Sequence, residues 1–429
     1  MITRRATQPE PSAERAALLT LMTRATRGTD PEVSMDELAG LAKAAGATVV
    51  VRASQERQTP DSATLFGKGK AAELALLCQA SDVAIVIVDH TLSPAQARNL
   101  EAIFLCRVID RTELILDIFA QRARTREGKL QVELAQLQYL LPRLVGSSTA
   151  LSRTGGGIGT RGPGETKLET DRRRIRDRIA ALKRDIAEVS ERRGYVRARR
   201  RRVEVPTVGL VGYTNAGKTT LFNAVTGDSS VASDALFVTL DPVVRRVRLP
   251  DARQIMVSDT VGFIDRLPHQ LVAAFRATLE EVVHADLLLH VIDAAAPDRE
   301  RRERAVRDVL TEIGATQVPI LDVYNKCDRL SQAETARLSV VAPAAVCVSA
   351  ARGDGVAGLI DLMASRLEMD TEHATFTFDF SSDADRRALT DLHRHARVTS
   401  QVTVGATVTV EADVPRRVLD RLQRLPEIA

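Results

Sequence analysis

The sequence predicts an α/β protein with several domains, and three observations support this. Strand, loop and helix patterns repeat between Pro206 and Met369, as expected of a doubly wound α/β domain. Short β-branched runs alternate with helical segments between Pro31 and Ala120, which indicates a smaller domain with a largely parallel sheet. The 429 residues also exceed the roughly 250 to 300 that a single hydrophobic core serves.

Composition excludes several classes of protein. The four cysteines are far apart and form no Cys-x-x-Cys or Cys/His grouping, so neither a disulfide framework nor a zinc site is expected. No apolar run approaches the roughly 20 residues that span a bilayer, and residues 1–31 lack the apolar core of a secretory signal. We therefore expect a cytoplasmic protein without a membrane segment, with residues 1–31 as a flexible extension.

Residues 32–125 are predicted to form the N-terminal α/β domain. Its strands are expected at 47–53, 83–89 and 106–110, where β-branched residues are frequent, with helical segments between them. Aromatic residues make up only 3% of the chain, so Val, Ile and Leu are expected to supply the core.

Residues 126–203 are predicted to form a long antiparallel helical hairpin. Apolar residues recur at intervals of three and four along both helices, which gives each helix one apolar face. These residues are Leu130, Leu134, Leu137, Leu141 and Leu144 on the first helix, and Ile175, Ile179, Leu182, Ile186 and Val189 on the second. The Gly-rich loop between them, 152–167, is either functional or a flexible connector.

Positive charge is concentrated in the second half of this hairpin. Sixteen Lys and Arg residues stand against seven Asp and Glu residues between Arg161 and Arg202, although the whole chain carries only +4. Such a tract is typical of a nucleic-acid contact and equally of a solvated helix face. Charge alone favours neither interpretation.

A phosphate-binding loop is predicted after the strand TVGLVG. Gly212 to Thr219 match G-x-x-x-x-G-K-[ST] between a strand and a helix, where backbone N–H groups can turn toward phosphate oxygens. Lys218 should reach the β- and γ-phosphates, and the Thr219 hydroxyl should bind Mg²⁺. The residues expected to contact the nucleotide here are Gly212, Tyr213, Thr214, Asn215, Ala216, Gly217, Lys218, Thr219 and Thr220.

Two further segments are predicted to respond to the γ-phosphate. Asp259 ends the strand QIMVSD and should hold Mg²⁺ through water, while Gly262 should offer its N–H to the γ-phosphate. Thr239 lies between the two motifs and can bind Mg²⁺ only while the γ-phosphate is present. Lys218, Thr239 and Gly262 are therefore predicted catalytic residues.

Residues that select the base follow two later strands. The Asp328 carboxylate can accept both N–H groups of the guanine N1/N2 edge, which adenine lacks, and Asn325 can meet the opposite edge. Lys326 can lay its stem along the base. The loop at Ser349 and Ala350 can offer a backbone N–H to guanine O6. GTP and GDP are thus the expected ligands.

Residues 371–429 are predicted to form a small α+β domain with the order strand, helix, strand, strand and helix. This domain carries no recognisable motif. Three histidines, His269, His393 and His395, have no metal-ligand spacing and are interpreted as surface or packing residues.

These motifs together resemble the P-loop GTPases of the translation-factor class. Phe263 stands where Ras-like proteins have a Gln that orients water, and this resemblance implies slow hydrolysis unless a partner supplies the missing function. Asn215 matches a position that helps to bind K⁺ in some of these relatives, so it joins the predicted catalytic residues, although it can also only brace the loop.

Four further segments, 65–74, 92–101, 108–144 and 152–179, resemble the HflX family of ribosome-associated GTPases. The predicted fold class is accordingly α/β. A doubly wound P-loop GTPase domain, residues 204–370, is preceded by the small α/β domain with its long antiparallel helical hairpin and followed by the small α+β domain.

The resemblance also implies partners. It predicts nucleotide-dependent binding of a monomer to the large ribosomal subunit, 23S rRNA and ribosomal proteins, through the N-terminal domain and residues 153–202. Rescue, splitting or recycling of ribosomes under stress would follow. Family members bind ATP through the N-terminal domain, where Gly67 to Lys70 either meet a phosphate or form a plain turn.

Two other functions stay open from the sequence. One is a GTP-dependent protein of rRNA maturation, although no transferase or deaminase constellation is present. The other is a non-catalytic regulatory protein that uses nucleotide only to fold or to dock a partner.

Overall fold

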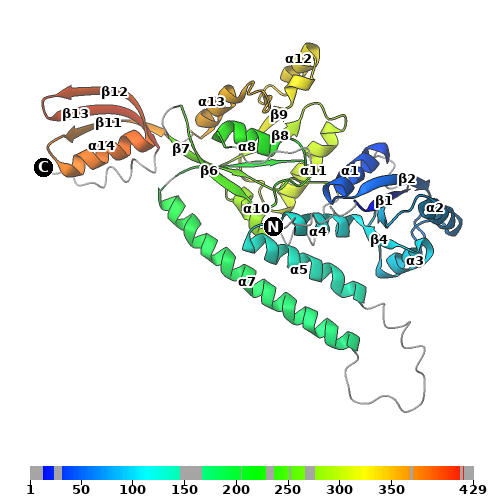
Figure 1. Ribbon diagram of the computed structural model, residues 1–429. Coiled ribbons are helices and arrows are strands. Elements are labelled where there is room, and N and C mark those ends of the chain that lie inside the picture. Colours follow the sequence, from blue (N-terminus) through cyan, green and yellow to red (C-terminus); the bar gives the residue numbers. More distant parts are fainter. Residues whose placement is uncertain are drawn as a thin grey trace, which may run out of the picture. The chain divides into compact units, whose positions relative to one another are not determined.

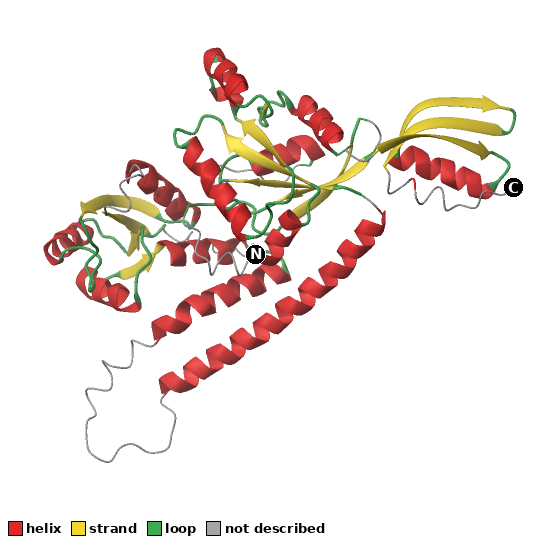
Figure 2. Cartoon of the chain, turned by 180° about the vertical axis from the view of Figure 1, so that it is seen from behind, coloured by secondary structure: helices red, strands yellow, loops and turns green. Residues whose placement is uncertain are grey.

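The structure is a computed structural model of the chain (Figures 1 and 2). It describes residues 13–23, 31–144, 167–203, 205–228, 236–250, 253–265, 276–367, 371–415 and 419. The chain forms two compact units. Unit 1 comprises Met1–Ala187, Asp234–Phe237 and Leu267–Ala274, and unit 2 comprises Glu188–Ser233, Val238–Arg266 and Phe275–Ala429.

Unit 1 is built on a four-stranded sheet with the order β2-β1-β3-β4, in which every strand pair is parallel. A parallel sheet needs a crossover between successive strands, and helices provide each crossover here. In chain order the elements are β1 (Arg15–Met22), α1 (Pro31–Ala44), β2 (Thr48–Glu56), α2 (Lys68–Ala80), β3 (Ile85–Val88), α3 (Pro94–Phe104), β4 (Arg107–Asp110), α4 (Arg111–Arg122) and α5 (Arg126–Arg143).

Strand β1 corrects the expectation that residues 1–31 form a flexible extension. Ala16 to Leu19 are fully buried, and β1 pairs with both β2 and β3 in the interior of the sheet. The run AALLTLM is short and follows a charged, Pro-containing segment, so its apolar character is easily missed. The parallel sheet of the N-terminal domain therefore includes residues that lie before position 32.

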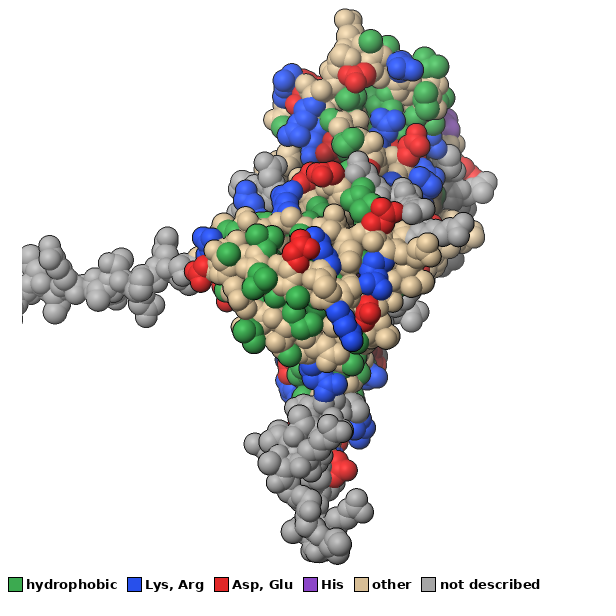
Figure 3. Space-filling model, turned by 90° about the vertical axis from the view of Figure 1, so that its right-hand side faces the viewer, with side chains coloured by type: hydrophobic (Ala, Val, Ile, Leu, Met, Phe, Trp, Pro, Cys, Tyr) green, Lys and Arg blue, Asp and Glu red, His purple; other side chains and the backbone are tan. Residues whose placement is uncertain are grey.

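The surface of unit 1 that carries α2 and α3 is mixed in character. Apolar side chains are interspersed there with basic and acidic ones (Figure 3). Leu76 and Leu77 on α2 are 69% and 45% exposed, while Leu74 of the same helix is buried in the core. Helix α2 therefore exposes two leucines on its outer side, together with polar residues such as Glu73 and Gln79.

Helices α5 and α7 (Lys167–Val203) run antiparallel beside each other in both views (Figures 1 and 2). Within unit 1, Arg178 of α7 makes two hydrogen bonds to the Glu133 carboxylate of α5, at 2.7 and 2.9 Å. Leu182 is fully buried, and the other apolar positions predicted on α7 are half-buried. The predicted hairpin is thus present, and most of its Gly-rich loop, residues 152–166, lies outside the described residues.

A short segment from far along the chain completes the core of unit 1. The ring of Phe237 meets the ring of Phe119 edge to face, with 4.7 Å between centroids, and both side chains are buried. Phe237 has a φ of 56°, which is an uncommon backbone conformation for a large side chain. A methyl group at Gly40 of α1 would lie only 3.2 Å from Leu236 Cδ1. Leu236 therefore packs closely against α1 at Gly40.

Unit 2 contains a six-stranded sheet with the order β10-β9-β8-β5-β7-β6, parallel except for β6. Val208 and Leu210 of β5 pack with Phe222 of α8 in one buried cluster. The elements are β5 (Thr207–Gly212), α8 (Lys218–Thr226), β6 (Val243–Arg248), β7 (Gln254–Asp259), α10 (Arg276–Val283), β8 (Leu287–Asp293), α11 (Arg299–Glu312), β9 (Ile320–Asn325), the 3₁₀ turn η3 (Cys327–Arg329), α12 (Gln332–Val341), β10 (Val346–Cys347) and α13 (Val356–Arg366). The predicted doubly wound domain is confirmed.

A separate antiparallel sheet follows, with the order β11-β13-β12. Its elements are β11 (Thr371–Asp379), α14 (Asp383–His395), β12 (Arg397–Val404) and β13 (Thr407–Pro415). Leu392 of α14 packs against Val408 and Val410 of β13. The predicted small α+β domain is therefore present, while its closing helix falls almost wholly outside the described residues. Among the helices that the structure describes, none combines the length and apolar character needed to cross a bilayer.

Arg111 offers a test of the buried charges in unit 1. Its guanidinium pairs with Asp89 at 2.8 Å and with Glu37, and all three side chains are buried. Arg111→Met removes the cation that both carboxylates face, so the free energy of unfolding of unit 1 should fall by about 3 to 5 kcal/mol. Hydrogen exchange of the β1 and β3 amides measures this free energy of unfolding.

The matched control is Arg52→Met, because Arg52 forms an exposed ion pair with Asp36. Its loss should change the same free energy by less than about 1 kcal/mol. The prediction would be contradicted if the free energy of unfolding fell by the same small amount in Arg111→Met and Arg52→Met.

Candidate functional site

The phosphate-binding loop connects β5 to α8 at the carboxyl edge of the unit 2 sheet. Gly217 precedes α8 with a φ of 91°, and a methyl group there would lie 2.3 Å from Asn325 Nδ2. Only glycine is compatible with both the positive φ and the close approach of Asn325, since other residues rarely adopt the left-handed region and carry a Cβ. Thr220 lies in the first turn of α8 and is half-buried. The loop therefore has the geometry that the sequence motif predicts.

The Lys218 side chain is buried within this loop. Its Nζ donates to Gly212 O at 3.1 Å and to Tyr213 O at 2.9 Å. The pKa of Lys218 is lowered to about 8, mainly because the side chain is buried; Asp259 acts to raise this pKa and the nearby Lys326 acts to lower it. A buried ammonium aimed along the loop is well placed to meet an anion.

Three oxygen-bearing side chains meet beside the loop. Asp259 Oδ2, at the end of β7, accepts from Thr219 Oγ1 at 2.8 Å and from Thr239 Oγ1 at 2.9 Å. The two hydroxyl oxygens are also 2.9 Å apart. The structure therefore brings together the three residues predicted to hold Mg²⁺.

The Asp259 carboxylate is almost fully buried, and one of its two oxygens can still accept a hydrogen bond or bind a cation. Burial raises the pKa of Asp259, while Lys218 and the two threonine hydroxyls act to lower it. Oδ1 has no hydrogen-bond partner among the described residues. An unpaired carboxylate oxygen beside two hydroxyls is a hard oxygen donor set of the kind that Mg²⁺ prefers, so these residues fit the ion.

The segment after Asp259 returns to the phosphate-binding loop. Phe263 N–H donates to Gly212 O at 3.0 Å, and Thr214 N–H donates to Phe263 O at 2.7 Å. The Phe263 side chain is 1% exposed. Gly262 is so close to the loop that a methyl group there would lie 2.9 Å from Thr214 Cα.

The predicted base-binding residues lie at the ends of β9 and β10. Asp328 accepts from Ser349 Oγ at 2.7 Å, and this bond is the main reason that the pKa of Asp328 is lowered. Lys326 Nζ donates to Asn215 O at 2.6 Å and to Asp293 Oδ2 at 2.8 Å. The lysine therefore connects the phosphate-binding loop to the end of β8.

Asn325 differs from its predicted position. Its Nδ2 donates to Ala216 O at 2.9 Å and its Oδ1 accepts from Ala350 N–H at 3.0 Å, and the side chain is 2% exposed. The amide therefore ties two loops together instead of facing a base edge. Its burial at the carboxyl end of a parallel strand accounts for the difference.

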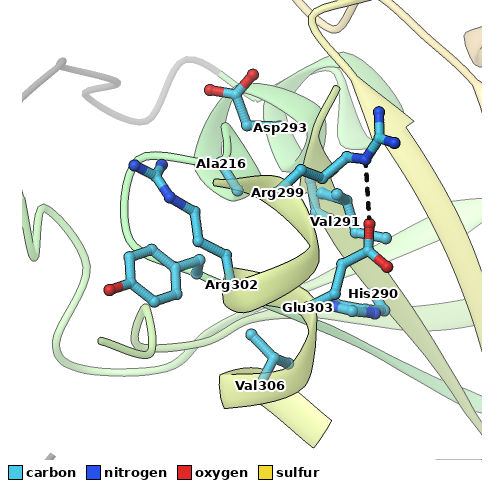
Figure 4. Close-up of a pocket in the computed structure, with 10 residues that line it drawn as sticks. Ala216, His290, Val291, Asp293, Arg299, Arg302, Glu303 and Val306 are labelled. Carbon is cyan, nitrogen blue, oxygen red and sulfur yellow. Dashed lines mark ion pairs between the residues drawn. The ribbon is translucent and has the colours of Figure 1, made fainter. Parts of the chain in front are cut away.

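Three residues near the site, Asp293, Asp265 and Arg301, were not predicted from the sequence. Asp293 ends β8 and pairs with Lys326, while Asp265 pairs with Arg301 and its N–H donates to Tyr213 Oη. The position of Asp293 at the carboxyl end of a parallel strand could have indicated it, but the contact to Arg301 depends on how α11 packs. Figure 4 shows Asp293, Arg302 and Glu303 around the small pocket between Ala216 and α11.

Other predicted positions belong to other parts of the chain. Gly67 precedes α2 and its N–H donates to Gln55 Oε1 at 2.9 Å, while Lys70 pairs with Glu73 at 2.6 Å. His393 is exposed on α14. His269 lies outside the described residues, and so does the His395 side chain. ATP binding at Gly67 to Lys70 stays a prediction.

Three family models match the chain. They are GTP-binding GTPase N-terminal over residues 32–120, GTP-binding GTPase Middle Region over 122–200 and 50S ribosome-binding GTPase over 207–326.

Similar proteins span most of the chain. The GTPase HflX of Caldanaerobacter subterraneus subsp. tengcongensis is 42% identical over 414 residues, 96% of this chain and 93% of that protein. The GTPase HflX of Escherichia coli is 49% identical over 352 residues, 82% of each. A crystal structure of a GTP-binding protein from Sulfolobus solfataricus with GDP has a TM-score of 0.46 and 25% identity, covering 82% of this chain and 98% of that one.

The lowered pKa of Lys218 predicts a pH dependence of nucleotide binding. Phosphates favour the protonated lysine, so binding takes up a proton once the pH exceeds the pKa of about 8 in the free protein. The affinity for GDP should be constant from about pH 6.5 to 7.5 and should fall above about pH 8, by up to tenfold per pH unit. Fluorescence titration with labelled GDP measures it, and a flat profile up to about pH 9 would contradict the assignment.

Proposed function

Because the chain belongs to the HflX family of GTPases, we propose that its hydrolysis of GTP controls its binding to the large ribosomal subunit. The observation that carries the proposal is the meeting of Thr219, Thr239 and Asp259. These residues come from the phosphate-binding loop, the segment before β6 and the end of β7. A ligand bound at this point contacts all three segments at once, as a nucleotide switch requires.

We propose that Mg²⁺ is held by the hydroxyls of Thr219 and Thr239 and, through water, by Asp259. The unpaired Oδ1 of Asp259 supports this donor set. The ion supplies positive charge that offsets the charge of the phosphates. The two hydroxyls and the carboxylate would hold the ion next to the phosphate-binding loop.

Hydrolysis in this site needs no covalent protein nucleophile, because positioning and charge stabilisation carry phosphoryl transfer. Lys218 provides charge, and Gly262 provides a backbone N–H. The Phe263 side chain is apolar and buried, so it cannot orient the attacking water. We therefore propose that the intrinsic rate is slow and that a ribosomal partner completes the site.

K⁺ near Asn215 stays a prediction. The Asn215 side chain is exposed, and its carbonyl accepts from Lys326 Nζ at 2.6 Å, so the residue also braces the loop. Equal hydrolysis rates in KCl and NaCl would remove K⁺ from the mechanism.

Helix α7 supports contact with rRNA. Seven of its cations are exposed among the described positions, namely Arg173, Arg174, Arg176, Arg178, Lys183, Arg184 and Arg192. RNA helices are recognised largely through their phosphates and shape, for which such a row of charges is suited. We propose that α7 and the N-terminal domain bind 23S rRNA and ribosomal proteins.

The finer role proposed is rescue, splitting or recycling of ribosomes under stress, by a monomer in the cytoplasm. The proposed nucleotide-dependent affinity for one subunit is compatible with this role, since a switch of this kind can bind, act and be released. Incubation of intact ribosomes with the protein and GTP would release free subunits if the role is splitting.

Asp328→Asn tests the base assignment. Asparagine presents an N–H where guanine also presents one, whereas xanthine presents an oxygen. The affinity for GDP should fall by about tenfold or more, and that for xanthosine diphosphate should rise. Competition titrations measure both affinities. The exposed Asp361→Asn on α13 is the matched control and should change neither.

Sedimentation with purified large subunits tests the proposed function. The protein should sediment with the subunit in a non-hydrolysable GTP analogue and much less in GDP, and subunits should stimulate GTP turnover by on the order of a hundredfold or more. Lys218→Ala should lose turnover in both conditions. Absence from the large-subunit fraction in every nucleotide state would reject the proposal, and loss of turnover without loss of biological activity would favour a non-catalytic regulator.

A further inference from the structure

The fold of unit 2 brings together two cysteines that stand 20 positions apart in the sequence, Cys327 and Cys347. We propose that these two thiols form a reversible disulfide, and that this bond weakens the binding of guanine nucleotides. The second part of the inference rests on the proposed function, because it takes Asp328 as the residue that binds the base.

The sheet fixes the position of Cys347, which ends β10. This strand runs parallel to β9 with Cys347 opposite Tyr324, and Val348 N–H donates to Tyr324 O at 2.8 Å. Successive side chains of a strand point to opposite faces. Val348 accordingly packs in the large core cluster of unit 2, whereas Cys347 packs against a smaller cluster that contains Tyr324 and Leu338.

Cys327 lies on the same face of the sheet. It begins the 3₁₀ turn η3, which also carries Asp328. Its N–H donates to Val348 O at 3.1 Å, and its Sγ donates to Tyr324 O at 3.2 Å. The side chain packs against the same small cluster as Cys347. Backbone and side-chain contacts therefore hold the turn against the end of β10.

The two thiols are direct neighbours. Burial raises the pKa of the Cys327 thiol, and Cys347 raises it further through its charge and through a hydrogen bond between the two side chains. Both cysteines are free and only half-buried, so neither is sealed within the core. A raised pKa keeps Cys327 protonated near neutral pH, and the pair therefore stays reduced until an oxidant persists.

The oxidant in this proposal is a small-molecule disulfide, such as oxidised glutathione. One cysteine thiolate attacks a sulfur of that molecule, which forms a mixed disulfide and releases one glutathione thiolate. The second cysteine thiolate attacks the protein sulfur of the mixed disulfide, which closes the new bond and releases the second glutathione thiolate. The protein thiols thus lose two protons and two electrons, and the glutathione sulfurs take up the electrons.

Closure of this bond moves the turn that carries Asp328. A disulfide joins its sulfurs at about 2.05 Å, whereas non-bonded heavy atoms stay about 3.5 to 4.0 Å apart. Strand pairing holds Cys347, so the movement falls on Cys327 and Asp328. Asp328 accepts from Ser349 Oγ at 2.7 Å, and a binding group tolerates displacements of only about 0.5 Å. The oxidised protein therefore binds the base less tightly.

Thermodynamic linkage makes the effect reciprocal. If the disulfide weakens GDP binding tenfold, bound GDP disfavours the disulfide by the same factor. For a two-electron couple this factor raises the reduction potential of the pair by about 30 mV. Two cysteines that only pack against their neighbours would show neither effect.

The test uses the full chain with Mg²⁺ in buffers of defined ratio of oxidised to reduced glutathione. Trypsin cleaves after Lys and Arg, so mass spectrometry of the oxidised protein should find residues 327–329 linked to residues 338–352. Oxidation should raise the Kd for GDP by about tenfold or more, and reduction should restore it. Saturating GDP should shift the ratio at which half of the pair is oxidised toward more oxidised glutathione.

Three single variants identify the bond that is responsible. Cys327→Ser and Cys347→Ser should each bind GDP equally well in oxidising and reducing buffer. Cys106→Ser is the matched control, because Cys106 is also half-buried but belongs to unit 1. This control variant should lose GDP affinity on oxidation as the unaltered protein does.

Three outcomes would overturn the proposal. They are absence of the linked fragment at every glutathione ratio, a Kd for GDP that stays equal or falls when the bond forms, and an equal loss of affinity on oxidation in Cys347→Ser. If the reduced protein does not bind GDP, the proposed function itself fails, whereas the linked fragment still shows whether the two thiols form a bond.

Discussion

The Asp259 carboxylate is the contact on which the site depends. Burial disfavours its charge, and the two threonine hydroxyls and Lys218 offset that effect. Because Oδ2 accepts from both hydroxyls, the start of α8 and the segment around Thr239 are tied to the end of β7 through one atom. In a buried environment such bonds are stronger than in water, and an unpaired partner is correspondingly unfavourable. Loss of this carboxylate would therefore disturb three segments and not one.

Much of the site follows from the sequence because parallel strands end at a common edge. Gly212, Asp259 and Asn325 each end or follow a strand of the same sheet, so the motifs that contain them had to converge. The roles of Asn325 and Arg301 could not be predicted in the same way. Asn325 turns inward to join two loops, and Arg301 meets Asp265 only because α11 packs beside the loop. Strand β1 was missed because six buried residues between charged neighbours give too short a pattern.

Phe263 shows how one position serves packing and control at the same time. A residue that cannot orient water contributes its side chain to the core and its backbone to the β-bridge with Tyr213. The residue that stabilises this part of the site therefore offers no polar side-chain group there. Stabilisation of a ground state does not help the chemical step, so the packing of Phe263 stabilises the site without supplying catalysis.

The packing of Phe237 against Phe119 has a consequence for the synthesis of the chain. Unit 1 is discontinuous, and a buried ring of its core is encoded roughly 120 residues after its partner. At about 5 to 20 residues per second, translation reaches Phe237 on the order of ten seconds after Phe119. During that interval the nascent N-terminal domain presents an uncovered aromatic surface, so its final packing is a late event and a chain that stops before Phe237 lacks part of its own core.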